Sequence, residues 1–128
     1  MFLKATCHCG NVSVELPRKP ESITSCNCSI CGRIGGMWAY YDRSEVTITV
    51  ENGTATYRWG DKQLDFVRCQ TCGCVMAWQG NENADGSRMG VNTRMIVPRD
   101  EIADVPVKLF DGADSWTVLE GHPGWGGF

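Results

Sequence analysis

Clustered cysteines constrain this chain more than any other feature of its sequence. Eight cysteines occur among 128 residues, in three short units: CHCG at 7–10, CNCSICG at 26–32 and CQTCGC at 69–74. Cysteines separated by one or two residues are placed to grip a single ion, whereas disulfide frameworks rarely concentrate them in this way. In a reducing compartment such clusters are typical of metal ligands. We therefore expect metal sites and not disulfides.

Each unit also carries a glycine beside its last cysteine pair: Gly10, Gly32 and Gly73. The backbone N–H groups of such a turn must fold back toward the thiolates. This commonly requires a positive φ, which glycine adopts at little cost. The pattern predicts three preformed ligand turns.

Zn²⁺ is the metal that these ligands favour, because it is tetrahedral, prefers thiolates and is redox-silent. One structural site takes four ligands, so two units must cooperate. The outer units supply one pair each, Cys7 with Cys9 and Cys69 with Cys72. A site closed over this sequence separation would pin the N-terminal hairpin to the middle of the sheet and would contribute folding free energy.

The middle unit then keeps three cysteines, Cys26, Cys28 and Cys31. Three protein ligands plus one exchangeable position is the ligand count of a catalytic zinc. Three thiolates leave the ion with a net charge of about −1, so it would activate water weakly and would suit a thiol ligand instead. A thiol that binds as a fourth thiolate adds negative charge, so a cation is expected nearby. Arg33 is the candidate, because it lies two residues after Cys31.

A fourth protein ligand would close the middle site instead. Cys74 is the main candidate, because eight cysteines would then make two complete Cys₄ sites. However, Cys74 follows Gly73 on a turn already assigned to the outer site. Its alternative role is that of a small buried hydrophobic residue that binds no metal. His8 is expected to point away from the outer site, and His122 is the remaining candidate. An iron–sulfur cluster fits the ligand type, but the spacings do not match the common cluster motifs.

Alternating apolar and polar residues dominate the rest of the chain and predict half-buried strands. The Asn52-Gly53 pair is typical of a hairpin turn, so 46–50 and 55–59 are expected to pair antiparallel. The other strands are expected at 2–6, 11–16, 37–41, 63–68, 74–78, 88–92 and 107–110.

Helix is scarce in this pattern. Residues 98–104 form the best short candidate, with Pro98 suited to a first helical position. The fold class is therefore all-β: short antiparallel strands with zinc-tied turns and little helix. We expect a single zinc-binding β domain over 1–120, followed by a glycine-rich tail at 121–128.

Composition excludes several classes of function. No apolar run approaches the roughly 20 residues of a membrane span. The first ten residues lack the apolar core of a signal peptide, since Cys7 and His8 arrive too early. The net charge is −3 without a run of lysine or arginine, whereas nucleic-acid binding needs a basic face. We expect a cytoplasmic protein that binds neither membranes nor nucleic acid and acts on a small molecule.

The succession C-x-C-G, C-x-C-x-x-C and C-x-x-C-G along a small β-rich chain resembles the glutathione-dependent formaldehyde-activating enzyme family. The stretches CNCSICGRIGGMWAYY, RCQTCGCVMAW and GVNTRM look like one bacterial branch of it, and the resemblance spans about residues 5–115. It implies a β-tent fold of stacked antiparallel sheets, a structural zinc on the outer cysteine pairs and a catalytic zinc on the middle triplet. The same partition follows from the ligand count above.

The resemblance further implies a carbon–sulfur lyase that joins glutathione to formaldehyde as S-hydroxymethylglutathione. Its partner would be a small-molecule thiol such as glutathione. The catalytic set would comprise Cys26, Cys28, Cys31 and Arg33. The alternative is a non-catalytic binding module in which cysteines close both zinc sites.

Glutathione carries carboxylates, so its pocket should hold arginine or a helix N-terminus. Arg33, Arg88 and Arg94 are the candidates, the first because of its proximity to the triplet. Arg88 and Arg94 are candidates because they flank a strand that also carries Asn92. The alternative for these two residues is that they are solvated charges at the ends of the strand.

The aromatic side chains on strand patterns are expected to pack in the core or on sheet faces, and not to stack on substrate. They are Tyr40, Tyr41, Trp59 and Trp78. Trp38 differs, because it follows Gly35-Gly36 directly after the triplet and is expected to wall the open metal position. Asp111 and Asp114 are expected to be solvated.

Overall fold

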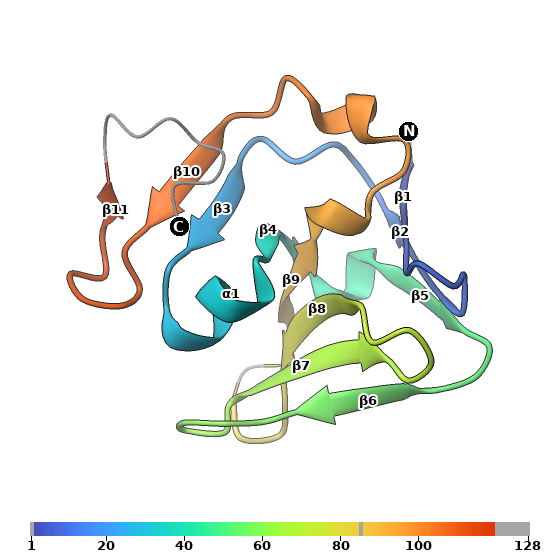
Figure 1. Ribbon diagram of the computed structural model, residues 1–128, viewed down its shortest axis with the longest axis horizontal. Coiled ribbons are helices and arrows are strands. Elements are labelled where there is room, and N and C mark those ends of the chain that lie inside the picture. Colours follow the sequence, from blue (N-terminus) through green and yellow to red (C-terminus); the bar gives the residue numbers. More distant parts are fainter. Residues whose placement is uncertain (1, 85, 120–128) are drawn as a thin grey trace.

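The computed structural model describes residues 2–84 and 86–119. The proposed tail at 121–128, with His122, lies outside the described residues. Figure 1 shows strands in two sheets with a few short helical turns between them. The helical elements are α1 (Ser29–Ile34) and the 3₁₀ turns η1 (Arg43–Glu45), η2 (Thr93–Met95) and η3 (Arg99–Ile102). The strands are β1 (Leu3–Thr6), β2 (Val12–Leu16), β3 (Ile23–Cys26), β4 (Met37–Asp42), β5 (Thr47–Val50), β6 (Thr54–Tyr57), β7 (Leu64–Cys69), β8 (Val75–Gly80), β9 (Arg88–Asn92), β10 (Val107–Phe110) and β11 (Val118–Leu119).

The smaller sheet has the order β1-β2-β5, and the larger has the order β11-β10-β3-β4-β9-β8-β7-β6. In Figure 1 the smaller sheet lies to the right of the central strands β4, β9 and β8, and β3, β10 and β11 lie to their left. The all-β class is confirmed. One pair departs from the expected antiparallel pattern, because β10 runs parallel to β3.

The hairpin predicted around Asn52-Gly53 is wrong. β5 pairs with β2 and β6 pairs with β7, so the strands on either side of this turn belong to different sheets. The side chain of Asn11 explains the crossing. It donates to the carbonyl of Gly53 at 2.9 Å and accepts a hydrogen bond from the backbone N–H of Asn52. The turn is therefore bound to the first cysteine loop and not to its own flanking strands.

The helix predicted at 98–104 is only a 3₁₀ turn over Arg99–Ile102, and Pro98 is its N-cap and not its first helical residue. Sequence alternation did not predict β3 or α1. Both are short, and α1 has a single buried residue, Cys31, so it shows no apolar periodicity. These two elements carry the middle cysteine unit.

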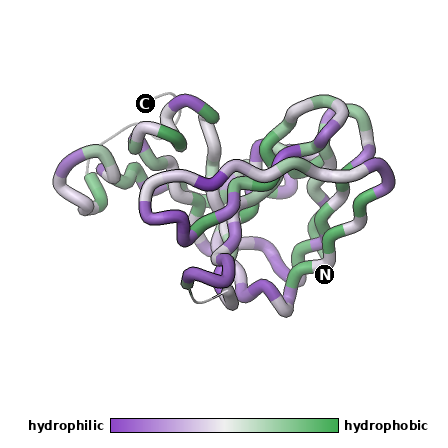
Figure 2. The backbone as a smooth tube through the Cα atoms, turned by 90° about the horizontal axis from the view of Figure 1, so that it is seen from below, coloured by the Kyte–Doolittle hydropathy of each residue, from purple (hydrophilic) through white to green (hydrophobic). Residues whose placement is uncertain are grey.

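Alternation along β4 separates two cores. Ala39 and Tyr41 join the main core, which includes Val14 of β2 and Val91 of β9. Trp38 faces the other way, into a smaller cluster with Cys31 and Phe66. In Figure 2 hydrophobic stretches run along the strands near the N-terminus, and hydrophilic stretches gather in several connecting turns. One face of the larger sheet thus serves stability, and the other face is available for a site.

Candidate metal centres and substrate pocket

The outer cysteine units meet in one group. Cys7 and Cys9 lie on the connection between β1 and β2, Cys69 ends β7, and Cys72 lies in the turn before β8. Their four sulfurs lie within 4.8 Å of one another, and the Cys7–Cys9 and Cys9–Cys69 sulfurs are each 3.6 Å apart. Sulfurs at about 2.3 Å from a tetrahedral zinc are separated by about 3.8 Å. The group therefore fits a zinc ion in both ligand type and spacing.

Backbone and side-chain N–H groups point at these sulfurs. Val12 donates to Cys7 Sγ at 3.3 Å, and Thr71 and Asn11 each donate to Cys69 Sγ at 3.3 Å. Burial raises the pKa of Cys69, but the hydrogen bonds that its sulfur accepts from Cys72, Asn11 and Thr71 outweigh burial and lower the pKa to about 5. The local structure thus favours the thiolate, which is the form that binds a metal.

The middle unit makes a second group from Cys26, Cys28 and Cys31, again with sulfurs within 4.8 Å of one another. Cys26 ends β3. Cys28 is the N-cap of α1, and its sulfur accepts the backbone N–H of Cys31 at 3.4 Å. A hydrogen bond from Cys31, outweighing burial, lowers the pKa of Cys26 to about 6. Three convergent thiols with one favoured as thiolate also fit a zinc ion, which prefers such ligands.

The glycine turns agree with expectation at two of the three units. Gly10 and Gly73 have φ values of +85° and +80°. Gly32 instead lies inside α1, and the left-handed residue of this unit is Gly35, with φ +71°, at the C-cap. The middle cysteines are therefore held by a capped helical turn, a different device from the two outer loops.

The loop after β10 braces the triplet from the other side. Asn27, between Cys26 and Cys28, donates to Asp111 Oδ1 at 3.0 Å and accepts the backbone N–H of Ala113 at 3.0 Å. Ser115 also donates to Asp111, at 2.8 Å through its hydroxyl. Asp111 is thus a bonded, half-buried residue and not the solvated charge that was expected, whereas Asp114 is exposed.

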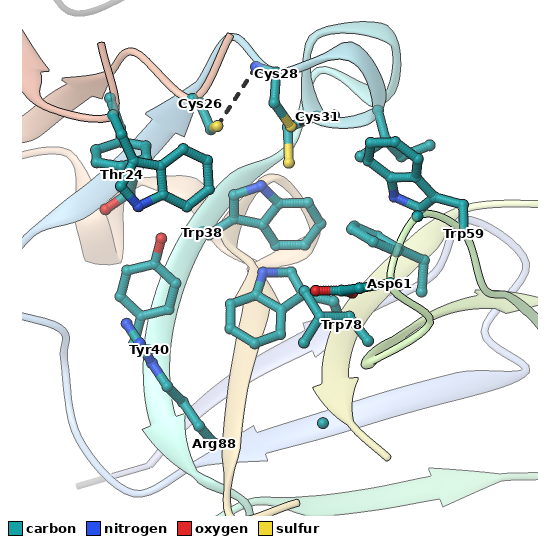
Figure 3. Close-up of a pocket in the computed structure, with 18 of the residues that line it drawn as sticks. Thr24, Cys26, Cys28, Cys31, Trp38, Tyr40, Trp59, Asp61, Trp78 and Arg88 are labelled. Carbon is teal, nitrogen blue, oxygen red and sulfur yellow. Dashed lines mark hydrogen bonds between the residues drawn. The ribbon is translucent and has the colours of Figure 1, made fainter. Parts of the chain in front are cut away.

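A cavity of about 840 Å³ opens beside the triplet and is lined by all three of its cysteines. Figure 3 shows the sulfurs at one end, with tryptophan and tyrosine rings around the remaining space. The charged lining residues are Asp61, Arg88 and Lys108. Its aromatic lining residues are Trp38, Tyr40, Trp59, Phe66, Trp78, Phe110 and Trp116.

Trp38 lines the cavity beside the cysteines, as expected. Tyr41 lies in the main core, also as expected. Tyr40, Trp59 and Trp78 line the cavity, and Trp78 also packs against the smaller cluster and the Tyr40 ring, which agrees with packing on a sheet face. Alternation identifies which residues share a face, but it does not show whether another layer covers that face. Trp116 and Phe110, which no sequence pattern marked as site residues, line the cavity together, and their rings pack edge to face with centroids 5.0 Å apart.

The arginine candidates differ in position. Arg88 lines the cavity and lies over the Tyr40 ring, 4.6 Å from its centroid. Arg33 is exposed, is not among the lining residues and donates to the Ser29 carbonyl of its own helix at 2.8 Å. Arg94 donates to the carbonyl of Gly35, and Asn92 is a buried link that donates to the carbonyl of Val75. The structure therefore brings Arg88, and not Arg33, to the pocket.

The spare ligand candidates lie apart from the triplet. Cys74 belongs to neither sulfur group and packs against the main core, while its carbonyl accepts the N–H of Cys69 at 2.9 Å. His8 is exposed between Cys7 and Cys9. Within 2–84 and 86–119, no further histidine, cysteine or carboxylate joins the three sulfurs. None of the eight cysteines is in a disulfide.

Two cysteine clusters that could each hold a metal ion, one of them open to an aromatic cavity, define a class of small β proteins with candidate metal sites. A family model described as glutathione-dependent formaldehyde-activating enzyme matches residues 2–110, and the chain belongs to this family. Formaldehyde activation with glutathione is the activity associated with the family.

A solved structure with the same fold is that of a Rhodobacter sphaeroides protein, determined as a structural genomics target. It is 29% identical to this chain with a TM-score of 0.65, and the match covers 81% of this chain and 98% of that one. A comparison with curated proteins finds no match. Among the described residues, no helix is long and apolar enough to cross a membrane.

Proposed function

We propose that the protein is a zinc-dependent carbon–sulfur lyase that acts on the adduct of a thiol and a carbonyl, with glutathione as the thiol and formaldehyde as the carbonyl. The observation that carries this proposal is the difference between the two cysteine groups. One has four sulfurs, and the other has three and opens onto a cavity. Four ligands close a structural zinc site, whereas three leave a position for substrate.

We assign the structural ion to Cys7, Cys9, Cys69 and Cys72 and the catalytic ion to Cys26, Cys28 and Cys31. When bound at the triplet, zinc supplies a positive charge that keeps a thiol ionised at neutral pH. The three cysteines orient the thiol at one end of the cavity, so that the reacting groups meet in a fixed geometry. Clustered cysteines act as metal ligands more often where thiols stay reduced, and we infer that the protein works in the cytoplasm.

The cavity offers contacts that a γ-glutamyl tripeptide needs. Arg88 and Lys108 supply positive charge for its carboxylates. The Tyr40 ring holds the Arg88 guanidinium at 4.6 Å from its centroid, which fixes its direction. The tryptophan walls exclude water from the reacting end and contact the apolar parts of the peptide. Arg33 is assigned no contact with substrate.

The proposal is tested by measuring the rate at which glutathione and formaldehyde exchange with S-hydroxymethylglutathione in zinc-loaded protein, by exchange NMR. The Cys28→Ser variant should lose the acceleration, because it removes one thiolate while serine still serves as an N-cap for α1. Cys74→Ser is the matched control and should keep it. Wild-type protein that does not exceed the uncatalysed rate would overturn the proposal and favour a non-catalytic binding module.

A further inference from the structure

The indole N–H of Trp38 is a buried donor without a partner. Trp38 is 1% exposed. Across residues 2–84 and 86–119, its Nε1 is the only buried side-chain nitrogen or oxygen that lacks a hydrogen bond. Buried polar groups are nearly always paired, and leaving one unpaired is costly. A partner from outside the folded chain is therefore the simplest explanation of this donor.

The ring is fixed with its nitrogen toward the cysteines. Trp38 lies in the middle of the sheet, paired with Thr24 and Asn92 on the two neighbouring strands. A Cβ at position 36 would lie 2.3 Å from the six-membered ring, so only glycine admits the indole there. Phe66 packs against it edge to face at 6.2 Å. Figure 3 shows the nitrogen edge turned toward the sulfurs of Cys26 and Cys31.

We propose that Trp38 donates this hydrogen bond to the oxygen of the carbonyl substrate and is thus a catalytic residue; this rests on the function proposed above. When the thiolate sulfur attacks the carbonyl carbon, a carbon–sulfur bond forms and the π electrons of the carbonyl move to oxygen. That oxygen then takes up the proton which the thiol released. Thiol plus aldehyde gives a hemithioacetal, with no other reactant. A donor already oriented toward this oxygen stabilises the charge that develops on it.

Three other polar groups of the cavity already have contacts within the protein. The Tyr40 hydroxyl is hydrogen-bonded to Thr24, and the Arg88 guanidinium lies over the Tyr40 ring. The indole nitrogen of Trp78 packs against the backbone of Gly90, where an added Cβ would lie 2.4 Å from it. Trp38 is the donor whose position matches the open end of the triplet. Trp78 is its matched control, since it is a tryptophan that lines the same cavity and its indole nitrogen packs against Gly90.

The direct test is the indole N–H signal of Trp38 in ¹⁵N-labelled, zinc-loaded wild-type protein, assigned with a Trp38→Phe variant. Adding glutathione with formaldehyde should move this signal downfield, because the adduct carries the oxygen. S-methylglutathione, which lacks that oxygen, should leave it nearly unchanged. An equal shift with glutathione alone would mean that the indole N–H donates to the glutathione sulfur and not to the carbonyl oxygen. No shift when the adduct is bound would mean that the N–H makes no hydrogen bond to the substrate. Either result overturns the inference.

Kinetics provide the second test. Trp38→Phe should lower kcat on the order of 10²-fold while the KM for glutathione changes little, as expected when one oxyanion donor is lost. Trp78→Phe should lower kcat much less. If wild-type protein catalyses the reaction but the two variants behave alike, only the role of Trp38 fails. If wild-type protein neither binds the adduct nor catalyses its formation, the proposed function itself fails.

Discussion

Gly112 lies directly against the sulfur of Cys26: a Cβ at position 112 would lie 2.6 Å from this sulfur and 3.2 Å from Cβ of Cys28. The contact follows from the sheet, because β10 runs parallel to β3 and pairs Phe110 with Cys26. The loop after β10 and the first cysteine of the triplet thus arrive at the same end of the sheet. The one parallel strand pair of the described fold places a wall beside the second metal site.

Gly112→Ala should therefore weaken the second zinc site selectively. Its methyl group must displace Cys26, and a disturbed ligand environment typically costs about 10–100-fold in metal affinity. Competition with a chromophoric chelator measures the two zinc affinities separately. Gly32→Ala is the control, because a Cβ there would meet its nearest neighbour, the Asn27 carbonyl oxygen, at an ordinary contact distance of 3.6 Å. Equal affinities in both variants would show that Gly112 does not limit the position of Cys26.

Asn11 should be among the most important polar residues for stability. It is 5% exposed and bridges Asn52, Gly53 and the Cys69 sulfur. Asn11→Ala leaves buried groups unpaired, and we expect the free energy of unfolding to fall by about 1–3 kcal/mol. Urea unfolding of zinc-loaded protein measures this loss. Asn83→Ala, which removes an exposed hydrogen bond to the Lys62 carbonyl, should cost less; equal losses would contradict the bridging role.

Arg88 is expected to set the affinity for glutathione. Removing a charged hydrogen-bonding partner typically costs enough to raise KM about tenfold or more, so Arg88→Ala should raise the KM for glutathione by this factor with a smaller change in kcat. Initial rates at varied glutathione concentration give both constants. Arg33→Ala should match wild type, because Arg33 bonds to its own helix. A larger increase in KM for Arg33→Ala than for Arg88→Ala would mean that Arg33, and not Arg88, binds glutathione.

Stability at high pH should depend on Tyr41. Burial raises the pKa of its hydroxyl to about 12, and the hydroxyl donates to the Arg18 carbonyl at 2.9 Å. A pKa raised on folding contributes stability that is fully present below the unfolded value of about 10 and is lost as pH rises toward 12. The free energy of unfolding should fall more steeply over this range in wild type than in Tyr41→Phe. Parallel curves would mean that Tyr41 ionises equally in both states.

The metal groups could be predicted from sequence because closely spaced cysteines leave few ways to share an ion. The pairs at 7–9 and 69–72 come together as predicted, and so does the triplet, since each set is held by a short local turn. Alternation likewise predicted most strands, including β4, where Ala39 and Tyr41 face the main core.

The remaining features depend on contacts that no local pattern encodes. The Asn52-Gly53 turn joins two sheets because the side chain of Asn11, far away in the sequence, binds both of its residues. Arg33 was favoured by its proximity in sequence, but the helix turns it outward. Arg88 lies far from the triplet in sequence, and it reaches the cavity only because β9 pairs with β4. The aromatic pocket similarly requires knowing which sheet face is left uncovered.

The proposed function requires that the triplet holds a zinc ion with one exchangeable position that takes a thiol. Native mass spectrometry of wild type, Cys28→Ser and Cys74→Ser, each with and without glutathione, tests it most directly. We expect two zinc ions and a glutathione adduct in wild type and in Cys74→Ser, and one zinc ion without an adduct in Cys28→Ser. Two zinc ions without an adduct in wild type, with the second ion lost in Cys74→Ser, would contradict it and show that cysteines close both sites.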